Sequence, residues 1–337
     1  MKGVVILGAG ASADFGLPVL SGVFKDLEAR RFLEENPNFL NQLNRHFWYP
    51  RGLDLESSNR GVTVEEILTT IRDFEENEYG LESFLKEEDQ LEFSKNLYCL
   101  IKKSVFDGKS SSRGRFLNPV IDFCSNRYTK STWGSFNWDC IFESSFYYHS
   151  GSPGPLGGRH NPKVAIKLNG WRNSNSSHLF LKLHGGVNWW ITDGNLEYLP
   201  FSGRDLNQRW ADYYSGRATG RPAILEPSFY KYDDQEIFPL LENQWQIFVQ
   251  ELIEADEVII LGYSAPEFDT KARQALMYGF QGNMRSRWLV VNPSQDHLNK
   301  YQRILGDRRV AYLEKTISSF SSSINEEATR ELERLKE

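Results

Sequence analysis

Four short polar segments, each directly after an apolar run, contain residue types that could act on a small molecule. They are Asn137-Trp138-Asp139, His184-Gly185-Gly186, Gly262-Tyr263-Ser264 and Asn292-Pro293. An asparagine amide both donates and accepts hydrogen bonds, an aspartate accepts them, and a histidine can take up a proton near neutral pH. Ligands of open α/β sheets bind at the carboxyl ends of the strands, so these segments together predict one binding site.

Each of these residues also has a purely structural interpretation. Asp139 can cap the helix expected from "CIFESSFYYH", and Asn292 can begin a turn before proline. A histidine beside a glycine, such as His184, is more often structural than catalytic. Taken singly, every residue keeps both interpretations, whereas their shared position at strand ends favours a ligand site for the set.

A fifth segment, near the start of the chain, has the spacing of a nucleotide-binding turn. Gly8-Ala9-Gly10-Ala11-Ser12-Ala13 fits the G-x-G-x-x-G/A pattern, in which small residues let backbone N–H groups approach a pyrophosphate. A tight strand-to-helix turn needs the same glycines without any ligand. The acidic residue that dehydrogenases place about 20 positions later would fall in the helical "FKDLEARRFLEEN", so a standard dehydrogenase is not expected.

The elements that must position these segments are strands and helices in alternation. Runs typical of buried strands lie at Val4–Leu7, Ser131–Phe136, Leu179–Leu183, Glu257–Leu261, Trp288–Val291 and Val310–Leu313. Helix patterns at Phe238–Glu254, Thr270–Tyr278 and His297–Leu305 alternate with the later strands. The sequence therefore predicts an α/β fold with a doubly wound, mainly parallel, Rossmann-like sheet.

We expect a single domain over residues 1–337 that contains a helical insertion at residues 23–123. This insertion has almost no strand pattern and follows the first strand-helix unit. Within it, Thr63-Val-Glu-Glu66 is a capping box that opens the amphipathic stretch "VEEILTTIRDFEE".

Residues 150–230 are expected to hold loop-rich insertions with a small hairpin. The loops are predicted at Ser150–Pro162 and Ser202–Pro227 from their glycine, proline and polar content, and the hairpin from Asp193-Gly194. The C-terminal "SSFSSSINEEATRELERLKE" predicts a polar stretch followed by a surface helix.

Composition and charge exclude several classes of protein. Hydrophobic residues make up 40% of the 337, enough for a large core, and the net charge of −6 gives no broad positive field for nucleic acid. No apolar stretch approaches the roughly 18 residues of a membrane span or forms a signal peptide, so we expect a cytoplasmic protein without membrane contact. Cys99, Cys124 and Cys140 form no C-x-x-C pair, which predicts neither a disulfide framework nor a metal site.

The order of these motifs resembles that of the sirtuin superfamily. In sirtuins a Gly-Ala-Gly-x-Ser loop precedes Gly-Ile-Pro, Asn-x-Asp, His-Gly, Gly-x-Ser and a late strand that ends in asparagine. The matching residues here are Gly8-Ala9-Gly10-Ala11-Ser12, Gly16-Leu17-Pro18, Asn137-Trp138-Asp139, His184-Gly185, Gly262-Tyr263-Ser264 and Asn292. No single motif is specific, but the ordered set is.

Three departures from the pattern indicate which branch of the superfamily the chain resembles. It has no cysteine after Cys140, where deacylating sirtuins carry a four-cysteine zinc module. Val19-Leu20-Ser21 stands where they have Asp-Phe-Arg, and Phe136 replaces the glutamine that usually precedes the motif asparagine. With its helical insertion, the chain is similar to the zinc-less, sirtuin-like NAD hydrolases of bacterial anti-phage systems, which deplete the NAD of the infected cell.

The resemblance implies that NAD is the substrate, that no metal takes part, and that the products are nicotinamide and ADP-ribose. Asn137, His184 and Asp139 would be catalytic, with Asp139 at the nicotinamide carboxamide. From their chemistry, Asn137 can orient water or ribose hydroxyls and His184 can act as a base. The residues that would hold the rest of the nucleotide are Gly8, Ala9, Gly10, Ser12, Gly262, Ser264 and Asn292.

Two other functions stay open at this stage. The chain could be a sirtuin-type deacylase or ADP-ribosyltransferase, or a non-enzymatic module that senses NAD or ADP-ribose. Because an unregulated NAD hydrolase would kill its host, we expect a homo-oligomer or a separately encoded trigger protein, such as an NTPase or an Argonaute-like protein. No residue in the sequence selects among these partners.

Overall fold

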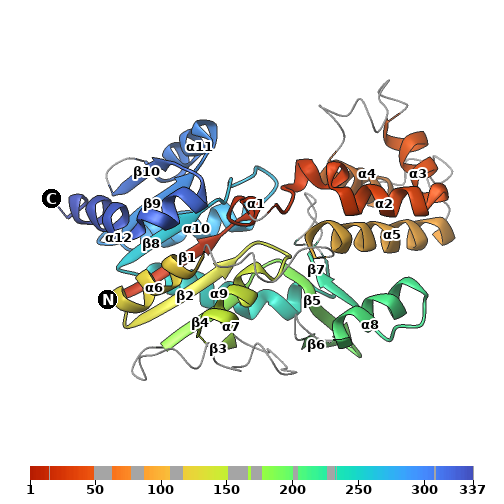
Figure 1. The fold of residues 1–337 in the computed structure, drawn as a ribbon, viewed down its shortest axis with the longest axis horizontal. Coiled ribbons are helices and arrows are strands. Elements are labelled where there is room, and N and C mark those ends of the chain that lie inside the picture. The colour runs from red at the N-terminus through yellow and green to blue at the C-terminus, as the bar shows by residue number, and fades with distance from the viewer. Residues whose placement is uncertain are drawn as a thin grey trace.

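The chain forms two sheets with helices packed around them (Figure 1). The computed structural model describes residues 1–14, 16–48, 63–76, 87–106, 117–150, 166–167, 177–199, 204–225, 232, 234–306 and 309–336. One sheet has seven strands and the other has three.

The larger sheet has the strand order β10-β9-β8-β1-β2-β4-β3. Its strands are β1 (Lys2–Leu7), β2 (Lys130–Ser135), β3 (Ile166–Lys167), β4 (Ser177–Lys182), β8 (Glu257–Leu261), β9 (Arg287–Asn292) and β10 (Val310–Glu314). All neighbouring pairs are parallel except β3 with β4. Leu7 lies opposite Ser135 on one side and Leu261 on the other, so the carboxyl ends of β2, β1 and β8 are level. The predicted doubly wound, mainly parallel sheet is confirmed.

Helices cover both faces of this sheet. They are α1 (Ala9–Ala13), α6 (Asn118–Arg127), α7 (Ile141–Ser150), α9 (Phe238–Glu254), α10 (Thr270–Gly282), α11 (Gln295–Leu305) and α12 (Ile317–Arg334). Helix α9 packs on β1, β2 and β4 and is joined by α10, while α12 packs on β9 and on α6. Every residue of β8 and β9 is buried, as expected for parallel strands covered on both sides.

The C-terminal segment differs from its prediction. Helix α12 begins at Ile317, one residue before the stretch predicted to be polar, and therefore includes that stretch; the Thr316 hydroxyl accepts a hydrogen bond from the Ser319 N–H at its start. Ile317, Phe320 and Ile324 are buried at helical spacing, and of the serines between them only Ser321 is also buried. Ala328 and Leu332 continue this buried apolar face, so α12 packs against the rest of the protein despite its serine-rich start and is not merely a surface helix.

The described residues between 23 and 117 are helical apart from short connections. Their α-helices are α2 (Leu27–Glu35), α3 (Pro37–Leu43), α4 (Val64–Glu76) and α5 (Glu87–Val105). The predicted capping box is confirmed, because the Thr63 N–H donates to Glu66 Oε2 at 2.7 Å and the Glu66 N–H donates to Thr63 Oγ1 at 3.2 Å. That residues 23–123 are an insertion stays a prediction, and its last six residues belong to α6, which packs on α12 and α7.

The smaller sheet has the order β6-β5-β7, from β5 (Gly185–Thr192), β6 (Asn195–Tyr198) and β7 (Arg221–Ile224). The predicted hairpin is confirmed: Thr192 pairs with Asn195, and the turn residues Asp193 and Gly194 have φ of +50° and +72°. Such positive φ angles are those of a type I′ turn.

The loop predicted at Ser202–Pro227 is wrong for most of its length. Residues 204–214 form helix α8 (Arg204–Tyr214), and β7 pairs with β5. Leu206 and Trp210, one helical turn apart, are buried and seat α8 despite its polar composition. Apart from Ser150, the last residue of α7, the other predicted loop at Ser150–Pro162 lies outside the described residues.

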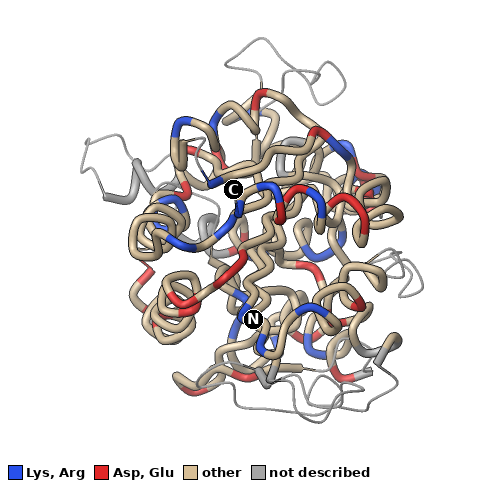
Figure 2. The backbone as a smooth tube through the Cα atoms, turned by 90° about the vertical axis from the view of Figure 1, so that its left-hand side faces the viewer, with Lys and Arg blue, Asp and Glu red and all other residues tan. Residues whose placement is uncertain are grey.

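Charged residues of both signs are interspersed along the described backbone (Figure 2). Two arginines of the supposed loop are held in ion pairs, Arg209 with Glu197 and Arg221 with Glu236. Among the residues that the structure describes, no helix has the length and apolar content needed to cross a membrane.

The turn after β1 and the turn after β8 pack backbone against backbone. The Gly10 N–H donates to the Gly262 carbonyl at 2.8 Å. A Cβ atom on Gly262 would lie 2.3 Å from the Ala11 nitrogen, and one on Gly8 would lie 2.3 Å from the Tyr263 Cα. Gly262 also has a φ of +64°, which side-chain-bearing residues rarely adopt. This contact requires the glycines whether or not a nucleotide binds there.

We expect Gly262→Ala to destabilise the protein much more than Gly194→Ala. Both glycines have a positive φ, which costs about 1–2 kcal/mol for alanine, but nothing lies within 4 Å of a Cβ on Gly194. At Gly262 the steric displacement adds about 1–3 kcal/mol. Urea unfolding followed by tryptophan fluorescence measures both losses, and equal losses would show that the two turns can separate without strain.

Candidate functional site

A cavity lies at the carboxyl ends of β1, β2, β4 and β8, bordered by the end of α5. Six of the predicted site residues line it: Ala9, Ser12, Asn137, Asp139, His184 and Ser264. Gly8, Gly10 and Gly262 are not lining residues, but they form the packed turns directly beside it. The structure thus gathers into one place segments that are up to about 250 residues apart in the sequence.

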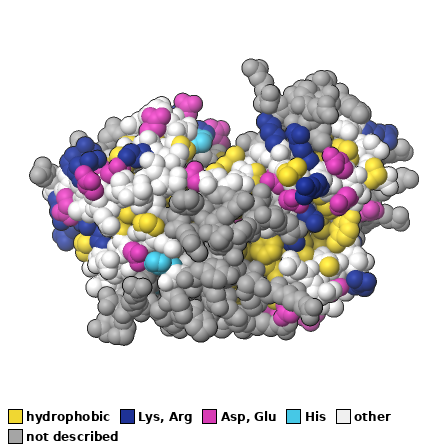
Figure 3. Space-filling model, viewed as in Figure 1, with side chains coloured by type: hydrophobic (Ala, Val, Ile, Leu, Met, Phe, Trp, Pro, Cys, Tyr) yellow, Lys and Arg dark blue, Asp and Glu magenta, His cyan; other side chains and the backbone are white. Residues whose placement is uncertain are grey.

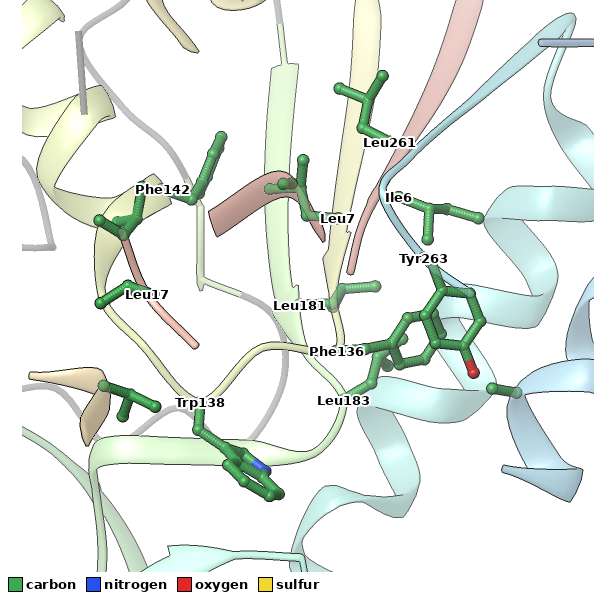
Figure 4. Packing of buried hydrophobic residues seen from close by; sticks show 14 of the residues in the cluster. Ile6, Leu7, Leu17, Phe136, Trp138, Phe142, Leu181, Leu183, Leu261 and Tyr263 are labelled. Carbon is green, nitrogen blue, oxygen red and sulfur yellow. The ribbon is translucent and has the colours of Figure 1, made fainter. Parts of the chain in front are cut away.

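The wall of the cavity is mainly hydrophobic and aromatic. The rings of Phe136 and Tyr263 stack with centroids 4.3 Å apart and an interplanar angle of 27° (Figure 4). Leu17, Trp138 and Phe268 also line the cavity. An apolar cavity with a few polar groups at fixed positions is typical of small-molecule sites.

Asn137 bridges two strand ends through its side-chain amide. Its Nδ2 donates to the Gly8 carbonyl at 2.9 Å and to Ser12 Oγ at 3.0 Å. The Gly8 carbonyl can only accept, so this contact fixes which end of the amide is nitrogen. The remaining Oδ1 is buried and has no hydrogen-bond partner among the described residues. Asn137 can therefore offer a ligand an acceptor but no donor, which is narrower than the dual role predicted from its residue type.

Asp139 starts helix α7 and also lines the cavity. Its Oδ1 accepts from the Ile141 N–H at 2.8 Å, as the helix-cap interpretation predicts, and its carboxylate accepts from the Ser12 hydroxyl. Burial raises the pKa of Asp139, while the hydrogen bond from Ser12 and the charge of Lys182 oppose that rise. The structural and ligand-binding interpretations of Asp139 are thus compatible.

Lys182, which sequence reasoning missed, holds the Asn137-Trp138-Asp139 turn in place by a hydrogen bond to its backbone. Its fully buried Nζ donates to the Asp139 carbonyl at 2.5 Å, to Glu143 Oε1 at 2.6 Å and to Asn188 Oδ1 at 3.3 Å. Burial is the largest single influence and lowers the pKa of Lys182, but the attraction of Glu143, Cys140 and Asp139 together outweighs it, so the pKa is raised. A lysine inside the otherwise apolar strand "LFLKL" is the signal that could have found it.

His184 is held between a backbone carbonyl and a buried carboxylate. Its Nδ1 lies 3.2 Å from the Phe136 carbonyl, which only accepts, so Nδ1 carries a proton. Its Nε2 lies 3.4 Å from Asp269 Oδ2 and 3.4 Å from the Tyr232 hydroxyl. Tyr232 and Tyr263 each donate a hydrogen bond to the Asp269 carboxylate. An imidazolium formed at His184 would face a carboxylate that two phenols hold in place.

Asp269 was also missed by sequence reasoning. It precedes α10 and occupies its N-cap position, where an aspartate is usually read as a helix cap. Its side chain makes no capping hydrogen bond and lies in the cavity wall, 1% exposed. No local pattern distinguishes this aspartate from an ordinary cap.

The structure does not place Asn292 in the cavity wall. Its Oδ1 accepts from the Ser294 N–H at 3.0 Å and lies 3.1 Å from His297 Nδ1, and its Nδ2 donates to the Tyr263 carbonyl at 3.4 Å. These contacts fit the turn interpretation of Asn292. A contact between Asn292 and a nucleotide ribose stays a prediction.

The described residues contain no group of three or more histidine, cysteine, aspartate or glutamate side chains that could hold a metal ion. Cys124 and Cys140 are buried, and burial raises the pKa of both thiols. That the site works without a metal stays a prediction.

Comparisons with known proteins relate this fold to the sirtuins. No family model and no curated protein matches the sequence. A triple mutant of a Sir2 homologue in complex with 2′-O-acetyl-ADP-ribose shares 14% identity over 98% of this chain and 93% of its own, with a TM-score of 0.51. A structure that addresses sirtuin substrate affinity shares 12% identity over 97% of this chain and 93% of its own, also with a TM-score of 0.51. The chain is thus similar in fold to sirtuins over nearly its whole length.

We expect Lys182→Met to destabilise the protein more than the double variant Lys182→Met with Glu143→Leu. The single change leaves a buried carboxylate without its cation, at a cost of about 3–5 kcal/mol, whereas removing both charges is often close to neutral. Chemical unfolding of the wild type, both single variants and the double variant measures the coupling. If the two single losses simply add up in the double variant, the ion pair is not what holds the Asn-Trp-Asp turn.

Proposed function

We propose that this chain, whose fold is that of the sirtuins, is an NAD hydrolase that releases nicotinamide and ADP-ribose. The observation that carries the proposal is the buried Asn137 Oδ1, an acceptor without a described partner in the same cavity as His184 and Asp139. A buried acceptor left unpaired costs about 1–3 kcal/mol, so a ligand or water that satisfies it gains that energy. The motif order and the hydrophobic, aromatic wall support a nicotinamide ring as the group that enters.

The proposed reaction breaks the bond between C1 of the ribose and the pyridinium nitrogen of nicotinamide. The electron pair of this bond returns to the ring nitrogen and neutralises its charge, so no acid is needed for the leaving group. The ribose develops the oxocarbenium character typical of glycosyl transfer. Water forms the new C1–O bond, and its proton passes to a base.

Asn137 and His184 supply the groups that such a water needs. Asn137 Oδ1 would accept a hydrogen bond from the attacking water or from a ribose hydroxyl. His184 keeps its Nδ1 proton on the Phe136 carbonyl, so Nε2 would take up the proton from water or from the hydroxyl. The Asp269 carboxylate beside Nε2 would stabilise the resulting imidazolium.

Asp139 and Trp138 would hold the nicotinamide carboxamide. The Asp139 carboxylate accepts hydrogen bonds and is positioned by the Ile141 N–H and the Ser12 hydroxyl. Trp138 lines the cavity, and its buried Nε1–H has no hydrogen-bond partner among the described residues. One acceptor and one donor match the amide and carbonyl groups of a carboxamide.

The remaining parts of NAD would lie along the turns after β1 and β8. Gly8, Ala9 and Gly10 would border the pyrophosphate, with Gly262 and Ser264 on the opposite side. Asn292 would reach the adenosine ribose only if its turn contacts rearranged.

In the cell, we propose a role in bacterial anti-phage defence by depletion of cytoplasmic NAD. The motif resemblance supports this role, together with the two departures from deacylating sirtuins, namely no cysteine after Cys140 and Val19-Leu20-Ser21 in place of Asp-Phe-Arg. Because unregulated hydrolysis would be lethal, the activity would depend on homo-oligomer formation or on a trigger protein of the NTPase or Argonaute-like kind.

Asn137→Ala and His184→Ala should each lower NAD consumption by at least about 100-fold, because they remove the acceptor and the base. Asn299→Ala and His149→Ala, on exposed or half-buried surfaces away from the cavity, are the matched controls and should keep the rate. Mass spectrometry of the products, with concentrated protein and with candidate partners present, provides the measurement.

The same assay separates the alternatives. Nicotinamide release that requires an acylated peptide or modifies a protein would identify a deacylase or an ADP-ribosyltransferase. Tight NAD or ADP-ribose binding in calorimetry without any turnover would identify a sensing module. A rate that survives both cavity substitutions would refute the proposed site.

Asp269→Asn should lower kcat about 10-fold or more with little change in KM, because it removes the charge that stabilises the protonated base but leaves the cavity shape. Asp234→Asn is the matched control, since Asp234 is a buried aspartate that accepts from backbone N–H groups outside the cavity. Steady-state kinetics and thermal unfolding of both variants test this. An unchanged kcat, or a loss of kcat matched by Asp234→Asn, would reduce Asp269 to a structural role.

A further inference from the structure

A second cavity lies where α2, α5 and α8 meet, away from the strand ends. It has a volume of about 370 Å³, within the range of small-molecule sites. We propose that it binds a nucleotide, that is, a phosphate-bearing ligand with a planar ring, and that its occupation alters the candidate site. The effect on catalysis rests on the proposed function, whereas the binding does not.

The polar part of this cavity is suited to a phosphate. Lys102 and Lys103 line it from α5, Asn207 lines it from α8, and Asn36 lines it from the α2–α3 junction. Glu35 is the one acidic group among its described lining residues, and it is exposed. Lys102 is only 8% exposed, which is unusual for lysine. Two ammonium groups and the Asn207 amide provide the charge and the hydrogen-bond donors that phosphate oxygens require, and Lys102 Nζ also lies 5.5 Å from the centroid of the Phe106 ring. Asn36 has only its second amide proton to add, because its Nδ2 already donates to the Phe32 carbonyl at 2.7 Å.

The apolar part of the cavity is suited to a planar ring. Phe32, Trp210 and Tyr214 line it, and Tyr214 is 44% exposed although its ring packs edge-on against Phe32 with centroids 6.0 Å apart. The Tyr214 hydroxyl donates to Asn36 Oδ1 and joins α8 to the α2–α3 junction. Figure 3 shows hydrophobic and charged side chains next to one another over the helices at the right of the view. Bases stack on aromatic rings with little dependence on their identity.

Two hydrogen bonds connect this cavity to the Asn-Trp-Asp turn. Trp210 Nε1 donates to the Val187 carbonyl at 2.8 Å, and the Val187 N–H donates to the Trp138 carbonyl at 3.0 Å. Trp210 lines the second cavity and Trp138 lines the candidate site. A ligand that moves the Trp210 ring therefore pulls on the backbone between Asn137 and Asp139.

Helix α5 is a second connection. Cys99, Lys102 and Lys103 on this helix line the second cavity, and Val105 at its end lines the candidate site. Since a helix rises about 1.5 Å per residue, the two sets of side chains lie within about one to two turns and move as one body. A phosphate that draws the lysines inward would shift Val105 against the substrate cavity.

Binding is tested by calorimetry with the four common nucleoside monophosphates and their triphosphates, and with inorganic pyrophosphate and adenosine as ringless and uncharged probes. The same titrations are repeated with Asn137→Ala, because a nucleotide that binds in the candidate site should bind this variant differently from the wild type, whereas one in the second cavity should not. We expect at least one nucleotide to bind more tightly than either partial probe. Lys103→Gln and Asn207→Asp should weaken it about tenfold or more, because they remove or repel phosphate charge. Lys95→Gln, also a half-buried lysine of α5 but outside the cavity, and Asn299→Asp are the matched controls.

The coupling is tested by hydrogen exchange and by NAD turnover. The bound nucleotide should change the exchange rate of the Val187 amide about threefold or more, and Trp210→Phe, which keeps the ring but loses the donor, should abolish this change while retaining binding. NAD turnover should change with nucleotide in the wild type and less in Trp210→Phe.

The outcomes separate the two proposals. No nucleotide binding, or binding that Lys103→Gln and Asn207→Asp leave intact, overturns the second site. Binding without any change at Val187 overturns the coupling through Trp210, and binding that leaves NAD turnover unchanged in a protein that consumes NAD overturns the coupling altogether. Binding and a changed exchange rate in a protein that never consumes NAD support the second site and refute only the hydrolase.

Discussion

The close contact between the turns after β1 and β8 is the constraint on which the site depends. Because Gly10 and Gly262 have no side chains, their backbones approach to within a hydrogen bond. This approach fixes the Gly8 carbonyl and the Ser12 hydroxyl where the Asn137 amide can reach both. Three strand ends are thereby locked together, and the amide oxygen left over is the acceptor at the centre of the proposed chemistry.

Buried charged groups hold the other two parts of the site. The Lys182 ammonium donates a hydrogen bond to the Asp139 carbonyl, and the Asp269 carboxylate lies beside His184 Nε2. Desolvating such groups is expensive, and an apolar core of the same volume would often be at least as stable. Their presence next to one cavity is better explained by the chemistry proposed for it than by stability, since catalytic groups need positions that packing alone does not fix.

The structure narrows the chemical roles that the residue types allow. Asn137 donates both amide protons to acceptors within the protein, so its side chain can only accept hydrogen bonds from a substrate or water. His184 keeps one proton on a backbone carbonyl, which leaves Nε2 as the nitrogen that exchanges a proton. The glycines of the first turn have a packing reason of their own, so their presence alone is not evidence for a nucleotide.

The sequence by itself determined the parallel sheet, the strand ends, the capping box at Thr63 and the hairpin at Asp193-Gly194, because these follow from patterns within a few neighbouring residues. Only the tertiary structure decided that residues 204–214 form a helix and that Lys182 pairs with Glu143. It also decided that the Asp269 side chain lies beside His184 and does not cap α10. Glu143 lies 39 positions from Lys182, and His184 lies 85 positions from Asp269. In α8, the polar composition masks the pattern of its two buried residues, Leu206 and Trp210. A buried charge is stabilised by whichever distant segment packs against it, and no local pattern encodes which segment that is.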